Sequence, residues 1–280
     1  MPFAAVVGDP VEHSLSPVLH QAGYAALGLT GWEYDARRVA SGALAGFLDS
    51  LRGEWRGLSV TAPLKREALG LAVTLTDRAR LAGGVNTLIP VAGGRWAGDN
   101  TDLPGAVAAI EERFDGSLAT ATILGGGATA ASVGLAVADL GVSRIVLAVR
   151  APATAGETVG LLRGHPAGPV VEVVPLAEAE PADVVVATIP AGAQTPALVE
   201  RLFEVPLLFE VTYNQWPTPL ARAATGALVS GLDLLVHQAV LQFEQFTGAP
   251  APLAAMRAAG EAALASPTPL TSRKLTPKSW

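Results

Sequence analysis

Short apolar runs alternate along the chain with longer segments in which apolar residues recur at helical spacing. In the first part of the chain the short runs predict strands at Ala4–Gly8, Trp32–Tyr34, Gly57–Val60 and Asn86–Pro90. The longer segments there predict helices at Pro17–Leu27, Gly42–Leu51, Pro63–Gly70 and Asp77–Leu81. Strands that are apolar throughout and separated by helices are typical of parallel sheets covered on both faces.

A second series follows. Its predicted strands are Thr120–Leu124, Arg144–Val149, Val170–Val174, Asp183–Thr188 and Leu207–Val211. Its predicted helices are Thr129–Leu140, Thr154–Arg163, Pro196–Phe203, Leu232–Phe246 and Pro252–Leu264. We therefore predict an α/β protein with two open, mostly parallel domains around a cleft. The first covers 1–103 and is completed by helices within 231–265, the second covers 104–230, and the Pro- and Ser-rich tail 266–280 is expected to be poorly ordered.

Composition narrows the class of protein. Half of the 280 residues are hydrophobic and 16% are charged, so a large core is expected. The net charge of −6 disfavours a nucleic-acid partner, because phosphate binding needs clustered Lys and Arg. The absence of cysteine excludes disulfides and thiol nucleophiles. Neither a signal peptide nor an apolar membrane span is visible, and we expect a cytoplasmic protein without a membrane partner.

A glycine cluster ends the strand Thr120–Leu124. Gly125, Gly127 and Ala130 satisfy the pattern G-x-G-x-x-A between that strand and a helix. The first glycine allows a tight turn, the second lets a pyrophosphate approach the backbone, and the small third residue lets helix and strand pack closely. The sequence therefore predicts that the second domain is a Rossmann dinucleotide-binding domain.

The next strand indicates which dinucleotide is bound. An NAD enzyme would place an acidic residue at its end for the ribose 2′-hydroxyl. Here the strand ends in Arg150, and no acid follows until Glu157. An arginine suits a 2′-phosphate, so NADP is favoured over NAD, the alternative being an ordinary surface arginine.

Lys65 is the only lysine in the first 273 residues, although the chain carries sixteen arginines. A lysine that persists where arginine supplies the other cations can be one whose proton the chemistry needs, because arginine stays protonated. The alternative is a solvated lysine at the start of a helix.

Polar side chains gather at loops or strand ends of the first series, in segments 13–17, 61–65, 85–87 and 98–102. Strand ends of an open parallel sheet face the ligand crevice, so these groups suit a small polyhydroxylated substrate. Ser16, Thr61 and Asp102 each stand shortly before a proline, so each is also expected to cap a helix.

Seven blocks, taken together, closely resemble the shikimate dehydrogenase family, and the similarity extends to about residue 265. The blocks are GDPVEHSLSPVLH (8–20), GLSVTAPLK (57–65), GGVNT (83–87), GDNTD (98–102), LGGGATA (124–130), YNQWPTPL (213–220) and GLDLLVHQA (231–239). The resemblance implies reversible, NADP-dependent reduction of 3-dehydroshikimate to shikimate, in aromatic amino acid biosynthesis.

The resemblance also implies roles for individual residues. Lys65 and Asp102 would form the catalytic acid–base pair. The substrate would be bound by Ser14, Ser16, Thr61, Asn86, Tyr213 and Gln238. The NADP pyrophosphate would lie against Gly125, Gly126, Gly127 and Ala128, and the 2′-phosphate would contact Arg150.

Some positions depart from the family pattern. Ser59 stands where Asn is usual, and Glu210 stands where Asp is common. Val149 and Ala151 flank Arg150 in place of Asn and Thr, which weakens the preference for NADP. Two alternatives stay open, namely an NAD-preferring quinate/shikimate dehydrogenase and a non-catalytic nucleotide-binding paralogue. The histidines lack metal-ligand spacing with acids, so we expect no metal. A monomer or homodimer is expected.

Overall fold

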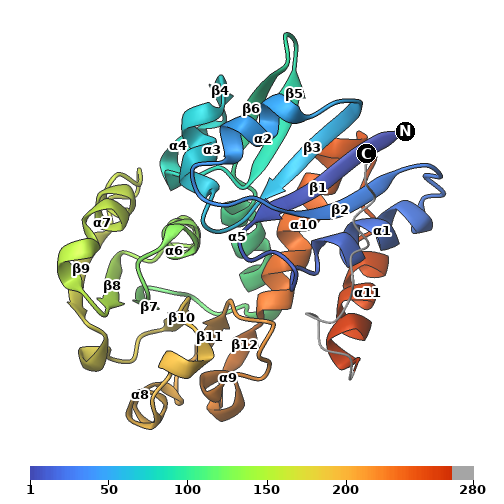
Figure 1. Cartoon of the computed structure of the whole chain (residues 1–280). Coiled ribbons are helices and arrows are strands. Elements are labelled where there is room, and N and C mark those ends of the chain that lie inside the picture. The colour runs from blue at the N-terminus through green and yellow to red at the C-terminus, as the bar shows by residue number, and fades with distance from the viewer. Residues whose placement is uncertain (267–280) are drawn as a thin grey trace. The chain divides into compact units, whose positions relative to one another are not determined.

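The computed structural model describes residues 1–266, which form two compact units (Figure 1). Among the described residues, the first unit comprises 1–80, 84–101 and 239–266. The second comprises residues 81–83 and 102–238. Apart from Ser266, the tail predicted to be poorly ordered lies outside the described residues.

The first unit contains a six-stranded sheet with the order β2-β1-β3-β5-β6-β4. Its strands are β1 (Pro2–Gly8), β2 (Glu33–Arg38), β3 (Glu54–Val60), β4 (Thr74–Leu75), β5 (Thr87–Val91) and β6 (Arg95–Asp99). β1 pairs in parallel with β2 and β3, whereas β5 runs antiparallel to both β3 and β6. The antiparallel hairpin and β6 were not predicted. Gly93 and Gly94 form its turn with φ of 78° and 68°, a conformation that favours glycine.

Helices cover both faces of this sheet. They are α1 (Ser16–Ala26), α2 (Leu44–Ser50), α3 (Lys65–Leu71), α4 (Asp77–Ala82), α11 (Leu253–Ala265) and the later part of α10 (Gly231–Thr247). Leu58 and Val60 of β3 join the core beneath α2 and α3. Gly57 and Ser59 point to the other face, where a Cβ on Gly57 would lie 2.1 Å from Phe246 Cε1. Glycine at position 57 therefore lets α10 approach the sheet.

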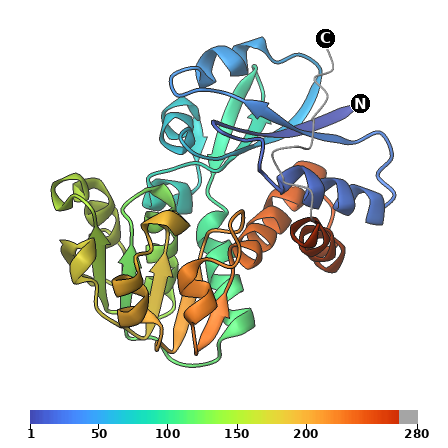
Figure 2. The same ribbon diagram turned by 60° about the horizontal axis from the view of Figure 1, so that its bottom comes forward.

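The second unit contains a fully parallel sheet with the order β12-β11-β10-β7-β8-β9, seen with its helices in Figure 2. Its strands are β7 (Thr120–Leu124), β8 (Arg144–Val149), β9 (Val170–Pro175), β10 (Val184–Ala187), β11 (Leu207–Glu210) and β12 (Ala227–Val229). Besides the earlier part of α10, its helices are α5 (Asp102–Arg113), α6 (Ala128–Asp139), α7 (Gly156–Arg163), α8 (Pro196–Leu202) and α9 (Pro219–Ala223). Counted from β7, the strands have the order 3-2-1-4-5-6 of a dinucleotide-binding sheet.

Both faces of this second sheet are buried. Val184 and Val186 of β10 join one core cluster, and Val185 and Ala187 join a separate cluster on the opposite face. Alternate residues of a strand point to opposite faces, so a strand covered on both sides must be apolar throughout. This confirms the physical basis on which the α/β fold was predicted.

Candidate active site

Three of the predicted site residues lie on adjoining backbone segments of the first unit. The N–H of Thr61 donates to the carbonyl of Val7 at 2.9 Å, which joins the ends of β3 and β1. The N–H of Val85 donates to the carbonyl of Lys65 at 2.9 Å, which places Lys65 beside the segment that carries Asn86. The structure thus gathers Thr61, Lys65 and Asn86 at one edge of the first sheet.

Asn86 is 2% exposed and its side chain is held in one orientation. Its Nδ2 donates to Thr101 Oγ1 at 2.9 Å. Its Oδ1 accepts from the N–H of Thr101 at 2.8 Å and from Thr87 Oγ1 at 2.7 Å. Because both ends of the amide are engaged, the side chain is fixed before any ligand arrives.

The serines at the start of α1 do not cap it as predicted. Leu15 occupies the N-cap position, no side chain bonds there, and Ser16 is the first helical residue. Ser14 Oγ instead accepts the N–H of Ser16 at 3.3 Å. Ser16 is buried, and its hydroxyl beside Tyr34 opposes the rise in the Tyr34 pKa that burial causes. The expectation that Ser16 is an N-cap is therefore wrong, since the helix already includes Ser16.

Thr61 does not cap α3 either. The N-cap of α3 is Leu64, with no side-chain bond, and Lys65 is the first residue of the helix. Thr61 contributes its backbone carbonyl, which accepts the N–H of Leu64 at 2.9 Å. The expected capping role of the Thr61 side chain is therefore wrong.

The glycine loop of the second unit joins β7 to α6. Gly125 has φ of 111°, and a Cβ there would lie 2.3 Å from Thr188 Oγ1, so glycine is required. Gly127 is the N-cap of α6, has no side-chain cap, and would place a Cβ in open space. Thr158 Oγ1 donates to the carbonyl of Gly126 at 2.7 Å and fixes the loop from α7. The loop leaves backbone N–H groups and room at a helix N-terminus, as a pyrophosphate requires.

Arg150 lies at the same edge of the second sheet as this loop. β7 and β8 are parallel, and Leu124 is in register with Ala148. Arg150 therefore follows β8 just beyond the level at which the glycine loop follows β7, and its side chain is exposed. The residues present fit a dinucleotide with a 2′-phosphate.

The remaining predicted residues also belong to the second unit. Asp102 is the first residue of α5 and is buried. Gln238 donates to the carbonyl of Leu235 at 2.8 Å, and its backbone packs so closely on α5 that a Cβ at Gly105 would lie 2.8 Å from its nitrogen. α5 and α10 thus bring Asp102 and Gln238 onto neighbouring helices.

Tyr213 lies in the loop after β11, which a buried carboxylate supports. Glu210 accepts from Gln194 Nε2 at 2.6 Å, Thr218 Oγ1 at 2.8 Å and the N–H of Thr212 at 2.9 Å. Burial raises the pKa of Glu210, while these donors oppose the shift. Glu210 therefore shapes the start of the loop that carries Tyr213.

Sequence reasoning missed three residues that contact this site. Tyr34, Ser59 and Gln242 are buried and are joined to Asn86 by hydrogen bonds, and the hydroxyl of Tyr34 lies close to that of Ser16. Gln242 gave one signal, since it is a polar residue on the buried face of a predicted helix. Its partner is 183 positions away, so the contact itself could not be read from the chain.

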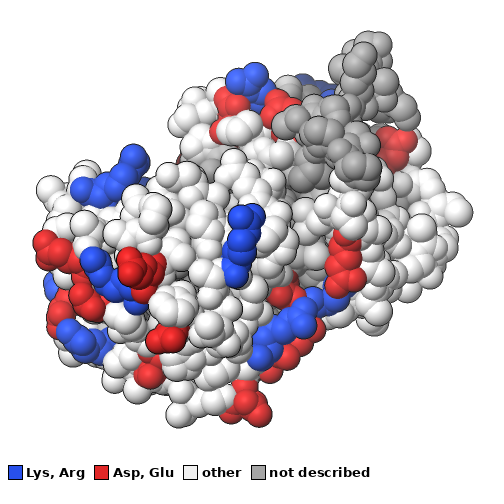
Figure 3. Space-filling model, turned by 90° about the horizontal axis from the view of Figure 1, so that it is seen from below, with Lys and Arg blue, Asp and Glu red and all other residues white. Residues whose placement is uncertain are grey.

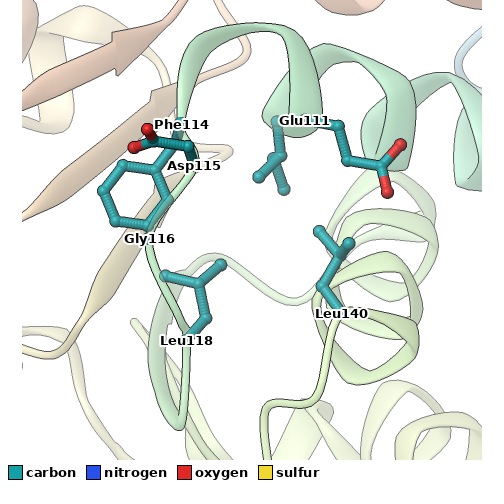
Figure 4. Close-up of a pocket in the computed structure, with 7 residues that line it drawn as sticks. Glu111, Phe114, Asp115, Gly116, Leu118 and Leu140 are labelled. Carbon is teal, nitrogen blue, oxygen red and sulfur yellow. The ribbon is translucent and has the colours of Figure 1, made fainter.

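A pocket of about 380 Å³ in the second unit lies elsewhere (Figure 4). It is lined by Ile110, Glu111, Phe114, Asp115, Gly116, Leu118 and Leu140. These residues come from the end of α5, the segment before β7 and the end of α6, so the pocket lies at the sheet edge opposite the glycine loop. It is separate from the candidate cofactor site.

The described residues limit two other kinds of site. None of the helices within 1–266 is long and apolar enough to cross a membrane. Within the same range, no cluster of three or more acidic or histidine side chains is arranged to hold a metal ion.

Comparison with known proteins agrees with this geometry. Residues 6–88 match the shikimate dehydrogenase substrate binding domain, and residues 231–259 match the shikimate 5′-dehydrogenase C-terminal domain. A curated shikimate dehydrogenase (NADP(+)) from Methylobacterium radiotolerans is 35% identical over 88% of this chain and 92% of the relative.

Solved structures are similar over nearly the whole chain. The crystal structure of Mycobacterium tuberculosis shikimate dehydrogenase is 37% identical with a TM-score of 0.82, and the match covers 94% of this chain and 100% of that one. A Thermus thermophilus shikimate 5-dehydrogenase in complex with NADP(H) and shikimate is 28% identical with a TM-score of 0.81, over 94% and 100% of the two chains. The chain therefore belongs to the shikimate dehydrogenase family.

Proposed function

We propose that the protein is an NADP-dependent shikimate dehydrogenase that reversibly reduces 3-dehydroshikimate to shikimate. The observation that carries this proposal is the glycine loop, with open space beside Gly127, at the same sheet edge as Arg150 in a chain of this family. The loop supports a dinucleotide, and the arginine supports the 2′-phosphate. Residues 1–103, completed by helices of 231–265, are the proposed substrate-binding domain, and residues 104–230 are the proposed NADP-binding domain.

Lys65 is the proposed proton donor. NADPH, when bound, supplies the hydride that reduces the ketone. The ammonium of Lys65 hydrogen-bonds the ketone oxygen and delivers the proton that completes the alcohol, and in the reverse direction the amine takes that proton back. Asp102 is proposed as its catalytic partner, accepting a hydrogen bond from a substrate hydroxyl. The structure describes Lys65 in the first unit and Asp102 in the second.

The other proposed substrate ligands provide complementary groups. Ser14 and Ser16 bind the carboxylate with Tyr213 nearby, while Thr61, Asn86 and Gln238 bind ring hydroxyls. The rigid hydrogen bonding of Asn86 supports its part, since a fixed amide discriminates between hydroxyl positions.

An assay of NADPH absorbance tests the proposal. We expect loss of NADPH with 3-dehydroshikimate and formation of NADPH from shikimate and NADP. The same assay with NAD and with quinate addresses the second candidate, which has support because Val149 and Ala151 leave Arg150 as the only cation in its segment. A preference for NAD and quinate would replace our assignment. NADPH binding without turnover would favour a non-catalytic paralogue.

The cellular location and assembly are also proposals. We infer a cytoplasmic enzyme that is a monomer or homodimer. Cell fractionation and light scattering of the purified protein would test these two statements separately from the assay.

A further inference from the structure

We propose that three buried side chains, Tyr34, Ser59 and Gln242, form a positioning relay that sets the orientation of the substrate ligands Ser16 and Asn86. The inference rests on the proposed function, because it assigns work to residues around the proposed substrate site. All five residues belong to the first unit, and each is at most 4% exposed.

The relay is ordered from its Gln242 end. The main-chain oxygen of Asn86 can only accept, and it takes a hydrogen bond from Gln242 Nε2 at 3.0 Å. This fixes which way the amide points, so Oε1 faces Ser59 and accepts its hydroxyl hydrogen at 2.6 Å. Ser59 has one hydrogen to give, and its oxygen therefore accepts from the hydroxyl of Tyr34, also at 2.6 Å.

The Gln242 end controls the side chain of Asn86. Gln242 Nε2 also donates to Thr87 Oγ1 at 2.9 Å, and Thr87 must then turn its own hydrogen to Asn86 Oδ1, 2.7 Å away. With Oδ1 held there, Nδ2 of Asn86 is directed to the opposite side. The N–H of Thr101 holds the same oxygen at 2.8 Å, so Gln242, acting through Thr87, reinforces the orientation of the Asn86 amide without belonging to the predicted site.

The Tyr34 end serves Ser16. The buried hydroxyl of Ser16 lies close to that of Tyr34, whose own hydrogen goes to Ser59 at 2.6 Å. When Ser16 gives its hydrogen to a substrate carboxylate, Tyr34 can turn its hydrogen to Ser16, because Ser59 keeps its bond to Gln242. Phenylalanine at position 34 would leave Ser16 without this support. Tyr34 is therefore a positioning residue for carboxylate binding.

The short side chain of Ser59 requires hydrogen-bond partners with long side chains. Its side chain is short, with the hydroxyl one carbon atom from the backbone. Tyr34 and Gln242 reach it from β2 and from α10, across the sheet face that Gly57 leaves open. These buried side chains satisfy one another's hydrogen bonds. Breaking one bond would leave a buried polar group unpaired, which is costly, so the three side chains keep their geometry together.

Two variants test the relay. Tyr34→Phe removes one hydroxyl, and Gln242→Met removes the amide at similar volume. For each we expect KM for shikimate to rise about tenfold or more, the effect of one lost buried hydrogen bond. The Kd for NADPH is expected to change less than about twofold, because the glycine loop is in the other unit. kcat is expected to fall less than KM rises.

Tyr24→Phe is the matched control. Tyr24 is 3% exposed and its hydroxyl has no hydrogen-bond partner, so this variant removes an equally buried hydroxyl outside the relay. We expect its KM to stay within about twofold of the wild type and its Tm to be unchanged or higher. An unchanged KM in Tyr34→Phe, or equal effects of Tyr24→Phe and Tyr34→Phe, would overturn the relay.

Gln242→Glu separates positioning from general damage. The carboxyl group keeps an oxygen facing Ser59 but can donate to the carbonyl of Asn86 only while protonated. We expect KM for shikimate, relative to wild type, to be near normal in acid and to rise with pH as the carboxyl ionises. A pH-independent KM ratio would contradict the relay. Failure of the proposed function is distinguishable, because wild-type protein would then neither turn over shikimate nor bind it in calorimetry.

Discussion

At the scale of single residues, Lys65 differs from the other cations of the chain, which are almost all arginines, because a lysine can release a proton and an arginine cannot. It begins α3, and its carbonyl is tied to Val85. Arginine would keep the charge and the helix but could not release a proton near neutral pH. For Lys65→Arg we expect a folded protein with unchanged NADPH affinity and turnover at least about a hundredfold lower, the size of general acid–base effects.

Arg66→Lys is the control for that measurement. It is the reverse exchange at the next position of α3, where the side chain is exposed. Steady-state rates within about twofold of wild type are expected, as for other surface substitutions. Wild-type turnover in Lys65→Arg would remove Lys65 from the mechanism.

His20 predicts how stability depends on pH. It is fully buried, neither ring nitrogen has a hydrogen-bond partner, and its ring stacks on Tyr34 at 4.1 Å and 12°. Burial lowers its pKa from 6.5 to about 3. Between those values the unfolded chain binds the proton and the folded chain does not, so stability falls as the pH falls through this window. From pH 7 to pH 5 the expected loss is about 2 kcal/mol.

Urea unfolding of His20→Phe at both pH values checks this. Phenylalanine can fill the same aromatic cluster without a titrating group. Between pH 7 and pH 5, the free energy of unfolding of His20→Phe should therefore decrease by about 2 kcal/mol less than that of the wild type. For Tyr24→Phe, which leaves the imidazole in place, the free energy of unfolding should decrease over this interval by as much as it does for the wild type. Parallel pH curves for His20→Phe and wild type would show that His20 is not the buried neutral group described.

At the scale of elements, the glycine loop offers a test that separates ligand binding from folding. Gly127 has φ of −89°, which any residue adopts, and an added Cβ would meet no atom of the protein. For Gly127→Ala we expect a Tm close to wild type and NADPH binding weakened about tenfold or more, because the methyl group would occupy space that the pyrophosphate needs. Calorimetric titration with NADPH measures the effect.

Gly156→Ala is the corresponding control at the start of α7. A Cβ there also meets no atom, so the same change is made at another helix start that is not part of the glycine loop. Its NADPH affinity should equal that of wild type. Equal affinities in the two variants would mean that the pyrophosphate does not lie against Gly127.

The elements also show what the sequence could and could not predict. The β7–loop–α6 unit was predicted from the chain because its signals are local: a buried strand, glycines at a fixed spacing and a helix. α5 was not predicted, because Pro104 and Gly105 interrupt the helical spacing of its apolar residues. The structure explains Gly105, since Gln238 packs directly against it. Capping by Ser16 was wrong because α1 begins one residue earlier than expected, with Leu15 at the N-cap position and Ser16 already helical.

At the scale of the molecule, charge is dispersed rather than concentrated. On the face drawn in Figure 3, and among the residues that the structure describes, basic and acidic side chains are interspersed between wide uncharged areas. That face does not present the continuous row of cations that tracks a nucleic-acid backbone. This surface is compatible with the small-molecule partners proposed above.

The two units share helices, and this predicts how the whole chain unfolds. The boundary between the units falls inside α4, between Arg80 and Leu81, and inside α10, between Gln238 and Ala239. Unfolding one unit would remove the packing of half of α10, and a helix half of that length is marginal alone. We therefore expect a single calorimetric transition. NADPH at a hundred times its Kd should stabilise the entire transition by about 2.7 kcal/mol, although its proposed ligands all lie in the second unit. Two transitions, with only one shifted by NADPH, would show that α10 does not couple the units.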